Sequence, residues 1–347
     1  MKMVLKLNEV RGMKSMAMAM VLAAGVGAWA QAPAPATAGV AQVGSPQAPA
    51  ANVKAPADPF PPVNLKNFTA PSPTTAEVNA FLKQAWGFDD DRIWSVAAIL
   101  KTQAPGVARV VVFAADKAHP EKVSRNEFFV TPDGKHAIAG GVVDFGPTPF
   151  AERRELMQQS AAGPAEGAAS KDLLIVLFLD LLNARSKDAQ DVVNNLVKDI
   201  PQARIVVEYL PADGSVYAMH AAEEGVCVRK AKGDAAFFAY AQDFYSRQKG
   251  LTATTLQPAL DAAVVAAGAD AKSVAACAAT PETKAVVEAS IALAAKAGVD
   301  VGPMLVVNGR VLPPVDVPYD TLKRIVAYQG QLDGIAVKVQ PTLTNLK

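Results

Sequence analysis

Cysteine and histidine are scarce in this chain of 347 residues, which has 2 cysteines and 3 histidines. Neither Cys227 and Cys277 nor the scattered histidines show the close spacing of metal ligands, so we predict no metal centre and no cofactor. Aromatic residues make up only 6% of the sequence, while apolar residues make up 51%. This balance favours alanine-rich helices over a large β-sandwich.

A surplus of charge is also missing. The 34 Lys and Arg residues nearly cancel the 33 Asp and Glu residues, which leaves a net charge of +1. Because no basic stripe stands out, a nucleic-acid partner is not expected. The length allows a sizeable core and two domains.

The N-terminus has the pattern of an export signal. Basic residues precede an apolar run over residues 16–29, and Ala28-Trp29-Ala30 is a small-x-small cleavage motif that makes Gln31 the first mature residue. The alternative is an uncleaved membrane anchor, but the run is short and rich in Ala and Gly for a span. We therefore expect residues 1–30 to be a signal peptide, no stable membrane span after cleavage, and a periplasmic or otherwise exported protein.

The composition of the first half of the mature chain predicts a linker, a small domain and a second linker. Residues 31–66 are rich in Pro and Ala and predict an extended, flexible linker. Residues 67–151 predict a small α+β domain, because an amphipathic helix with Glu77 in its first turn precedes several strand-like runs, including "HAIAGGVVDF". The Asp-Gly pair in "TPDGKH" predicts a hairpin turn. Residues 152–170, which include "GPAEGAAS", predict a second linker.

The second half follows the order of a thioredoxin fold. The segment "LLIVLFLD" is a continuous apolar run of the kind found in buried parallel strands. A helix and the strand "ARIVVEYLP" follow, then helices over about 212–298, and finally two strands joined by Asn308-Gly309 and a last helix. The predicted class is thus α/β, with a thioredoxin-like domain over residues 171–332, a helical insertion within it, and a C-terminal tail over 333–347.

Four segments in this order resemble the DsbA-type thioredoxin-like proteins, which are exported disulfide oxidoreductases. They are "VLFLDLLNARSK", "AAEEGVCVRKAKGDAAFFAYAQDFY", "SVAACAATPETKAVVEASIALAAKAGV" and "VGPMLVVNGRVLP". The resemblance implies a thioredoxin fold with a helical insertion. More vaguely, "NEFFVTPDGKHAIAGGVVDFG" resembles the N-terminal domain of exported disulfide isomerases, which implies a homodimer formed through this domain.

The redox motif of that family is absent from this chain. Where the family carries Cys-x-x-Cys, this sequence has Asn183, Ala184, Arg185 and Ser186. An amide cannot ionise or form a mixed disulfide, and a Ser hydroxyl needs a base to become a nucleophile. We expect Asn183 to cap the following helix, since Asn is among the best N-cap residues. Arg185 is either a solvated charge or a contact for an acidic partner.

The resemblance also implies a peptide-binding strand that begins at a cis-proline. Pro303 holds that position, with Gly302 before it and Met304 after it. If the Gly302–Pro303 bond is cis, the peptide-binding shape survives without catalysis; otherwise Pro303 only fixes the start of a strand.

Cys227 and Cys277 lie on separate predicted helices among Val and Ala residues. In an exported protein they are expected to form a structural disulfide, with free buried thiols and a redox-active pair as alternatives.

These residues favour a non-catalytic, chaperone-like protein that binds unfolded or extended protein segments in the cell envelope. The alternative is a thiol-disulfide oxidoreductase or isomerase that works through Cys227 and Cys277 or through cysteines of a partner. Two further hypotheses stay open. One is glutathione binding through Ser186, and the other is a purely structural protein assembled by its N-terminal domain.

Overall fold

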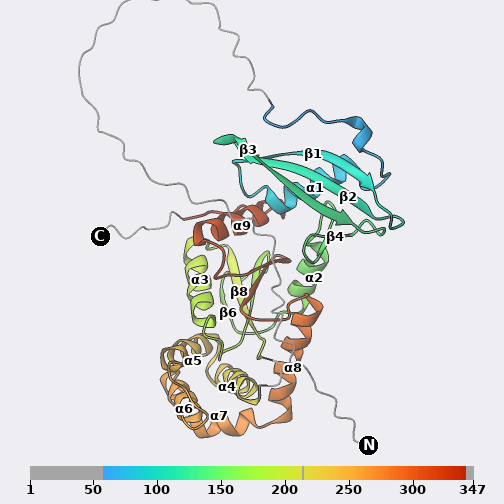
Figure 1. The fold of residues 1–347 in the computed structure, drawn as a ribbon. Helices are drawn as coiled ribbons and strands as arrows, with labels where there is room; N and C mark the ends of the chain where they lie inside the picture. Colours follow the sequence, from blue (N-terminus) through green and yellow to red (C-terminus); the bar gives the residue numbers. More distant parts are fainter. Residues whose placement is uncertain (1–57, 213–214, 341–347) are drawn as a thin grey trace, which may run out of the picture.

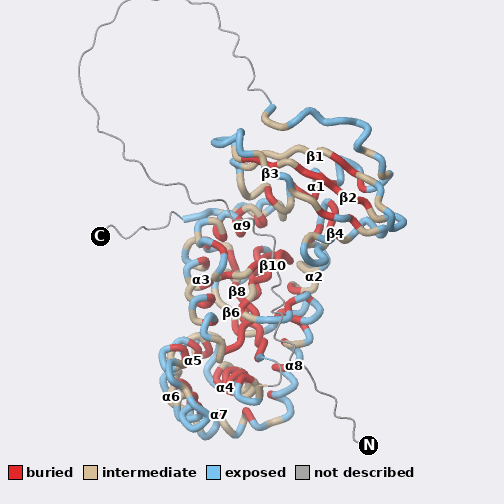
Figure 2. The backbone as a smooth tube through the Cα atoms, in the orientation of Figure 1, coloured by how far each residue is buried: buried red, intermediate tan, exposed pale blue. Residues whose placement is uncertain are grey.

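The computed structural model describes residues 58–212 and 215–340, which form two domains. Figure 1 places the N-terminal domain beside helix α9, and helices α5–α7 lie at the opposite end of the molecule. In Figure 2 the buried residues follow the strands of both domains. The predicted signal peptide and residues 31–57 of the predicted linker 31–66 lie outside the described residues. Within the described ranges, no helix is long and apolar enough to cross a membrane.

The N-terminal domain is the predicted α+β unit. Its elements are η1 (Leu65–Asn67), α1 (Thr75–Trp86), β1 (Arg92–Lys101), β2 (Ala108–Asp116), β3 (His119–Val130), β4 (His136–Ile138) and β5 (Val142–Asp144). The five strands form an antiparallel sheet in chain order. Helix α1 begins with a capping box between Thr74 and Glu77 and contributes Phe81 and Trp86 to the core beside the sheet.

The hairpin predicted at Asp133-Gly134 is confirmed. Gly134 has a φ of 66°, and Val130 pairs with Ala137 across the turn. The segment "HAIAGGVVDF" is not one strand, as its composition suggested. It folds back on itself so that Ile138 of β4 pairs with Val142 of β5, because two glycines in succession allow a tight reversal.

The second domain is the predicted thioredoxin-like fold with its helical insertion. Its elements are α2 (Ala151–Ser160), β6 (Ala165–Gly167), β7 (Leu173–Leu179), α3 (Ser186–Asp199), β8 (Ala203–Tyr209), α4 (Val216–Lys232), α5 (Asp234–Arg247), α6 (Leu256–Ala266), α7 (Ala271–Ala278), α8 (Pro281–Lys296), β9 (Met304–Val307), β10 (Arg310–Leu312) and α9 (Tyr319–Leu332). The sheet order is β10-β9-β7-β8-β6, with β7 parallel to β8. Residues of α3 and α9 pack on one face of β7, and residues of α2 and α8 pack on the other.

The predicted linker 152–170 is wrong, because this segment belongs to the second domain. Helix α2 is mostly polar, which hid it in the sequence, but Met157 is buried against β7. Strand β6 then pairs antiparallel with β8. The turn between α2 and β6 is fixed by the buried carboxylate of Glu208, which accepts hydrogen bonds from the backbone N–H groups of Ala162 at 2.8 Å and Gly163 at 2.9 Å.

The described part of the predicted tail, residues 333–340, also packs on this domain. Ile335 and Val337 contact its core, and the backbone N–H of Gln340 donates to the carbonyl oxygen of Asp199 at 2.7 Å. Apolar residues at alternating positions thus extend the core beyond α9.

The predicted Asn308-Gly309 turn is confirmed and joins β9 to β10. Both residues have positive φ, at 42° and 92°, as a two-residue turn of this type requires. The Asn308 side chain accepts from the N–H of Leu174 at 2.7 Å and donates to the carbonyl oxygen of Asp172 at 2.8 Å. The turn is thereby fastened to the start of β7.

Arg310, directly after this turn, joins the two domains. Its guanidinium donates to the carbonyl oxygens of Gln84 at 3.2 Å and Ala85 at 2.6 Å, in the last turn of α1. It also lies over the rings of Phe88 and Phe150. Burial lowers the pKa of Arg310 to about 10, so the side chain remains charged at neutral pH. A cation is favourable at this end of a helix because the helix dipole is negative there.

We predict that Arg310→Met lowers the free energy of unfolding by about 2 to 4 kcal/mol, because two carbonyl groups lose their donor at a buried site. Urea unfolding measures the change. Arg324→Ala is the control, since Arg324 is 52% exposed and its 3.6 Å ion pair with Asp89 also crosses the domain boundary. The control should cost no more than about 0.5 kcal/mol. Equal effects of the two variants would contradict the role given to Arg310.

Candidate functional site

The candidate site begins where β7 ends, at Asp180. This carboxyl group is only 7% exposed, and its oxygens accept hydrogen bonds from the backbone N–H groups of Leu182 at 2.8 Å and Ala212 at 3.1 Å. Burial raises the pKa of Asp180, and the two hydrogen bonds oppose this effect only in part. Asp180 therefore fixes the loops after β7 and β8 to each other.

Asn183 does not cap helix α3, which corrects the prediction. The helix begins at Ser186 with Arg185 as its N-cap residue, two positions later than expected. The Asn183 side-chain oxygen accepts from the N–H of Arg185 at 2.9 Å, and its amide donates to the carbonyl oxygen of Gly302 at 3.1 Å. Asn183 thus stabilises the turn before the helix and ties it to the loop before β9.

The other three residues of the corner differ in exposure. Ser186 is fully buried, and its hydroxyl donates to the carbonyl oxygen of Asp180 at 2.6 Å. A hydroxyl in this position is not available to a ligand such as glutathione. Arg185 is exposed and forms an ion pair with Asp316, and Ala184 is exposed.

Gly302 and Pro303 lie beside this corner, and the bond between them is cis. A Cβ atom at Gly302 would lie 3.1 Å from the carbonyl oxygen of Phe178 and 3.2 Å from the Cα atom of Leu179. The close approach of this loop to β7 therefore explains the glycine. Met304 is partly buried at the start of β9, opposite Phe178.

A groove opens next to Asn183 and Gly302, with a volume of about 660 Å³. We call it the corner groove. The start of α4, the end of α8 and the loops after β8 and α8 form its walls. Its larger apolar side chains are Leu210, Val216, Met219, Ile291, Val299 and Val301. Val216 is 73% exposed and Val301 is 63% exposed. The charged residues among its described lining, Asp180 and Asp300, are both acidic.

Sequence reasoning found Asn183 and Gly302 but missed the apolar walls of the corner groove. Met219 and Ile291 lie more than seventy positions apart in the sequence, and both read as ordinary helix residues. Val216 is an exposed apolar residue at the start of α4, but its exposure is known only from the structure.

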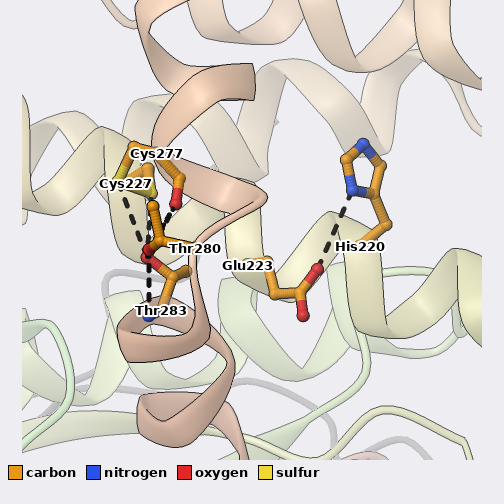
Figure 3. The surroundings of a disulfide bond; sticks show 6 residues. All are labelled: His220, Glu223, Cys227, Cys277, Thr280 and Thr283. Atoms are coloured by element: carbon orange, nitrogen blue, oxygen red, sulfur yellow. Dashed lines mark hydrogen bonds and ion pairs between the residues drawn. A yellow bond between two sulfur atoms is a disulfide. The ribbon is translucent and has the colours of Figure 1, made fainter.

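The predicted disulfide is confirmed, at a distance from the corner. Cys227 in α4 is bonded to Cys277 in α7, with Cα atoms 5.9 Å apart. Cys227 lies about 16 Å along α4 from Val216, at 1.5 Å per residue. Figure 3 shows Thr283 of α8 beside the bond; its Oγ1 lies 3.5 Å from the Sγ of Cys227 and 3.6 Å from the Sγ of Cys277.

A sequence comparison supports this description of the second domain. The family model described as Thioredoxin matches residues 184–327. The second domain is thus thioredoxin-like in both fold and sequence, and the predicted resemblance to the DsbA-type proteins is confirmed at the level of the fold. No curated protein sequence matches the chain.

Solved structures similar to this chain include three thioredoxin-like proteins. The catalytic domain of ScsC from Proteus mirabilis is 21% identical, with a TM-score of 0.44, over 52% of this chain and 97% of that domain. A thioredoxin-like oxidoreductase from Silicibacter pomeroyi is 22% identical, with a TM-score of 0.44, over 51% and 98%. The thiol-disulfide exchange protein alpha-DsbA2 from Wolbachia pipientis is 14% identical, with a TM-score of 0.43, over 51% and 96%.

The raised pKa of Asp180 implies that the free energy of unfolding depends on pH. Below the pKa of this group in the unfolded chain, about 3.9, both states are protonated and burial carries no charge cost. As the pH rises through the higher folded-state pKa, the native state bears a buried charge and loses stability. We predict that Asp180→Asn removes this loss, so that the stability of the variant relative to wild type rises as the pH increases above about 4 and levels off above the folded-state pKa of Asp180.

Urea unfolding at several pH values measures this difference. Asp172→Asn is the matched control, because Asp172 is an exposed carboxyl before the other end of β7. A constant difference between Asp180→Asn and wild type over the whole pH range would contradict the prediction.

Proposed function

We propose that this protein is a non-catalytic binder of extended, apolar protein segments, which it holds in the corner groove. The observation that carries the proposal is an apolar groove directly beside a thioredoxin-type corner without a thiol. We further propose a chaperone-like role in the cell envelope. The signal-like pattern at the N-terminus supports that location, although it lies outside the described residues.

A bound segment would gain affinity mainly from its apolar side chains. The carbonyl oxygen of Gly302 already accepts a hydrogen bond from Asn183, so a ligand N–H must share or displace it. Burial of one aliphatic side chain contributes about 1.5 to 3 kcal/mol, and association itself costs several kcal/mol. We therefore expect micromolar or weaker affinity and rapid release, as suits a protein that holds its clients briefly.

Oxidoreductase activity through Cys227 and Cys277 remains the alternative, with less support. Redox-active thiols lie at helix starts, where the dipole stabilises a thiolate, whereas Cys227 is in the middle of α4 and only 2% exposed. The bond also lies outside the lining of the corner groove, so a segment held there would not meet it.

Self-association through the N-terminal domain is part of the same proposal. Strand β5 is a free edge of the described sheet, and the neighbouring side chains of Ile138 and Val142 are 41% and 69% exposed. An exposed strand edge with apolar side chains favours pairing with another chain. Analytical ultracentrifugation of wild type and of Val142→Lys tests it; a monomer at all concentrations would exclude it.

We predict that Met219→Asp combined with Val301→Asp weakens the binding of an unfolded, apolar model peptide at least about tenfold, since charges replace two apolar contacts. Fluorescence anisotropy of a labelled peptide measures it. Val286→Asp is the matched control, because Val286 is a 46% exposed valine of α8 outside the groove. Equal loss in both variants, or no binding by wild type, would refute the corner groove as the site.

We also predict that Asn183→Cys with Ser186→Cys creates a disulfide reductase in an insulin assay, whereas wild type shows no turnover. The corner already presents position 183 at the surface and position 186 behind it, at the start of a helix. The helix dipole there favours a thiolate. Either single variant is the control and should remain inactive. Wild-type turnover that disappears in Cys227→Ala with Cys277→Ala would instead support the alternative function.

A further inference from the structure

The Cys227–Cys277 disulfide forms part of the wall of a second hollow, which we call the disulfide hollow. Its volume is about 740 Å³, and both cysteines line it, together with the end of α4 and the loop between α6 and α7. Cys227 is only 2% exposed, whereas Cys277 is partly exposed. Cys277 is therefore the more accessible of the two residues to a nucleophile that enters the hollow.

The charges around the disulfide hollow favour an anion. Lys230 and Lys232 line it from the last turn of α4. Asp270 is the acidic residue in its lining, and this carboxylate caps α7 by accepting from the N–H of Ser273 at 2.8 Å and from its hydroxyl at 2.6 Å. The hollow can admit a small molecule but is too small for a folded protein. A small thiolate matches it in both charge and size.

The disulfide also braces the corner groove. Helix α4 contributes Val216 and Met219 to one wall of that groove, and α8 contributes Ile291 to the other. The bond links α4 to α7, which leads directly into α8, and the Thr283 hydroxyl of α8 donates to the carbonyl oxygen of Cys277 at 3.0 Å (Figure 3). The bond thus couples α4 to α8 indirectly, through α7 and the Thr283 hydrogen bond, and the other parts of α4 and α8 line the groove.

We propose that the disulfide hollow is a site for a small anionic thiol, and that reduction there releases the brace and weakens binding in the corner groove. The thiolate attacks the Sγ of Cys277, the S–S bond breaks, and its electron pair leaves on the Sγ of Cys227, which takes a proton from solvent. A second thiol then attacks the mixed disulfide at the sulfur of the first, so that two thiols become one small disulfide and the protein gains two thiol groups.

The chemical half of the proposal is tested by the rate at which thiols appear in the native, oxidised protein. Glutathione, which is anionic, and 2-mercaptoethanol, which is neutral, are compared. Lys230→Gln with Lys232→Gln should slow reduction by glutathione roughly threefold to tenfold and leave the rate with 2-mercaptoethanol unchanged. Lys249→Gln with Lys338→Gln removes the same charge outside the hollow and should change neither rate. Equal slowing with both thiols, or no reduction before denaturation, would overturn the proposal.

The second half of the proposal, that reduction weakens binding in the corner groove, rests on the proposed binding function. Its test distinguishes failure of this effect from failure of the proposed function. Peptide affinity is measured on the oxidised protein and on the reduced, alkylated protein, with far-UV circular dichroism to show that both are folded. Oxidised protein should bind at least about threefold more tightly, since the brace preorganises the groove. Equal peptide affinity of the oxidised and reduced proteins would refute the effect of the disulfide on the corner groove and leave the proposed function intact. No peptide binding by the oxidised protein would refute the proposed function itself. Cys227→Ser with Cys277→Ser should behave as the reduced form.

Discussion

The burial of strand β7 on both faces is the constraint on which the rest of this structure depends. All seven of its residues are 0 to 1% exposed, because one helix layer covers each face of the sheet. A strand enclosed in this way can meet solvent only beyond its end, where Asp180 and the corner lie. The loop before β9 approaches the same end so closely that a Cβ atom at Gly302 would crowd it. The candidate site is therefore a consequence of the core.

The corner keeps its shape without the residues that make it reactive elsewhere. Asn183 forms two hydrogen bonds, to the turn and to the loop before Pro303, and Ser186 forms one to the end of β7. These hydrogen bonds hold the turn to the end of β7 and to the loop before β9. The cost of burying Asp180 remains, however, since the described part of the chain gives its carboxylate only backbone N–H groups as hydrogen-bond partners.

The sequence predicted what depends on local pattern. The apolar run of β7, the turns at Asp133-Gly134 and Asn308-Gly309, and the disulfide all follow from nearest neighbours or from composition. It failed for α2, whose polar surface conceals one buried methionine, and it placed the cap of α3 two residues early because Asn183 has a partner across the corner. The groove walls could not be predicted, because they require α4 and α8 to converge.

The N-terminal domain is attached near the Asn308-Gly309 turn, at the start of β7 and therefore at the end of the sheet opposite Asp180. Arg153 of α2 forms an ion pair with Asp144 of β5 at 2.8 Å and donates to the carbonyl oxygens of Ala297 at 2.8 Å and Gly309 at 2.9 Å. Ala297 ends α8 and leads directly into the groove loop. One side chain therefore joins the edge strand of the first domain to a groove wall of the second. Together with Arg310, it fixes how the free edge of β5 is placed relative to the corner groove.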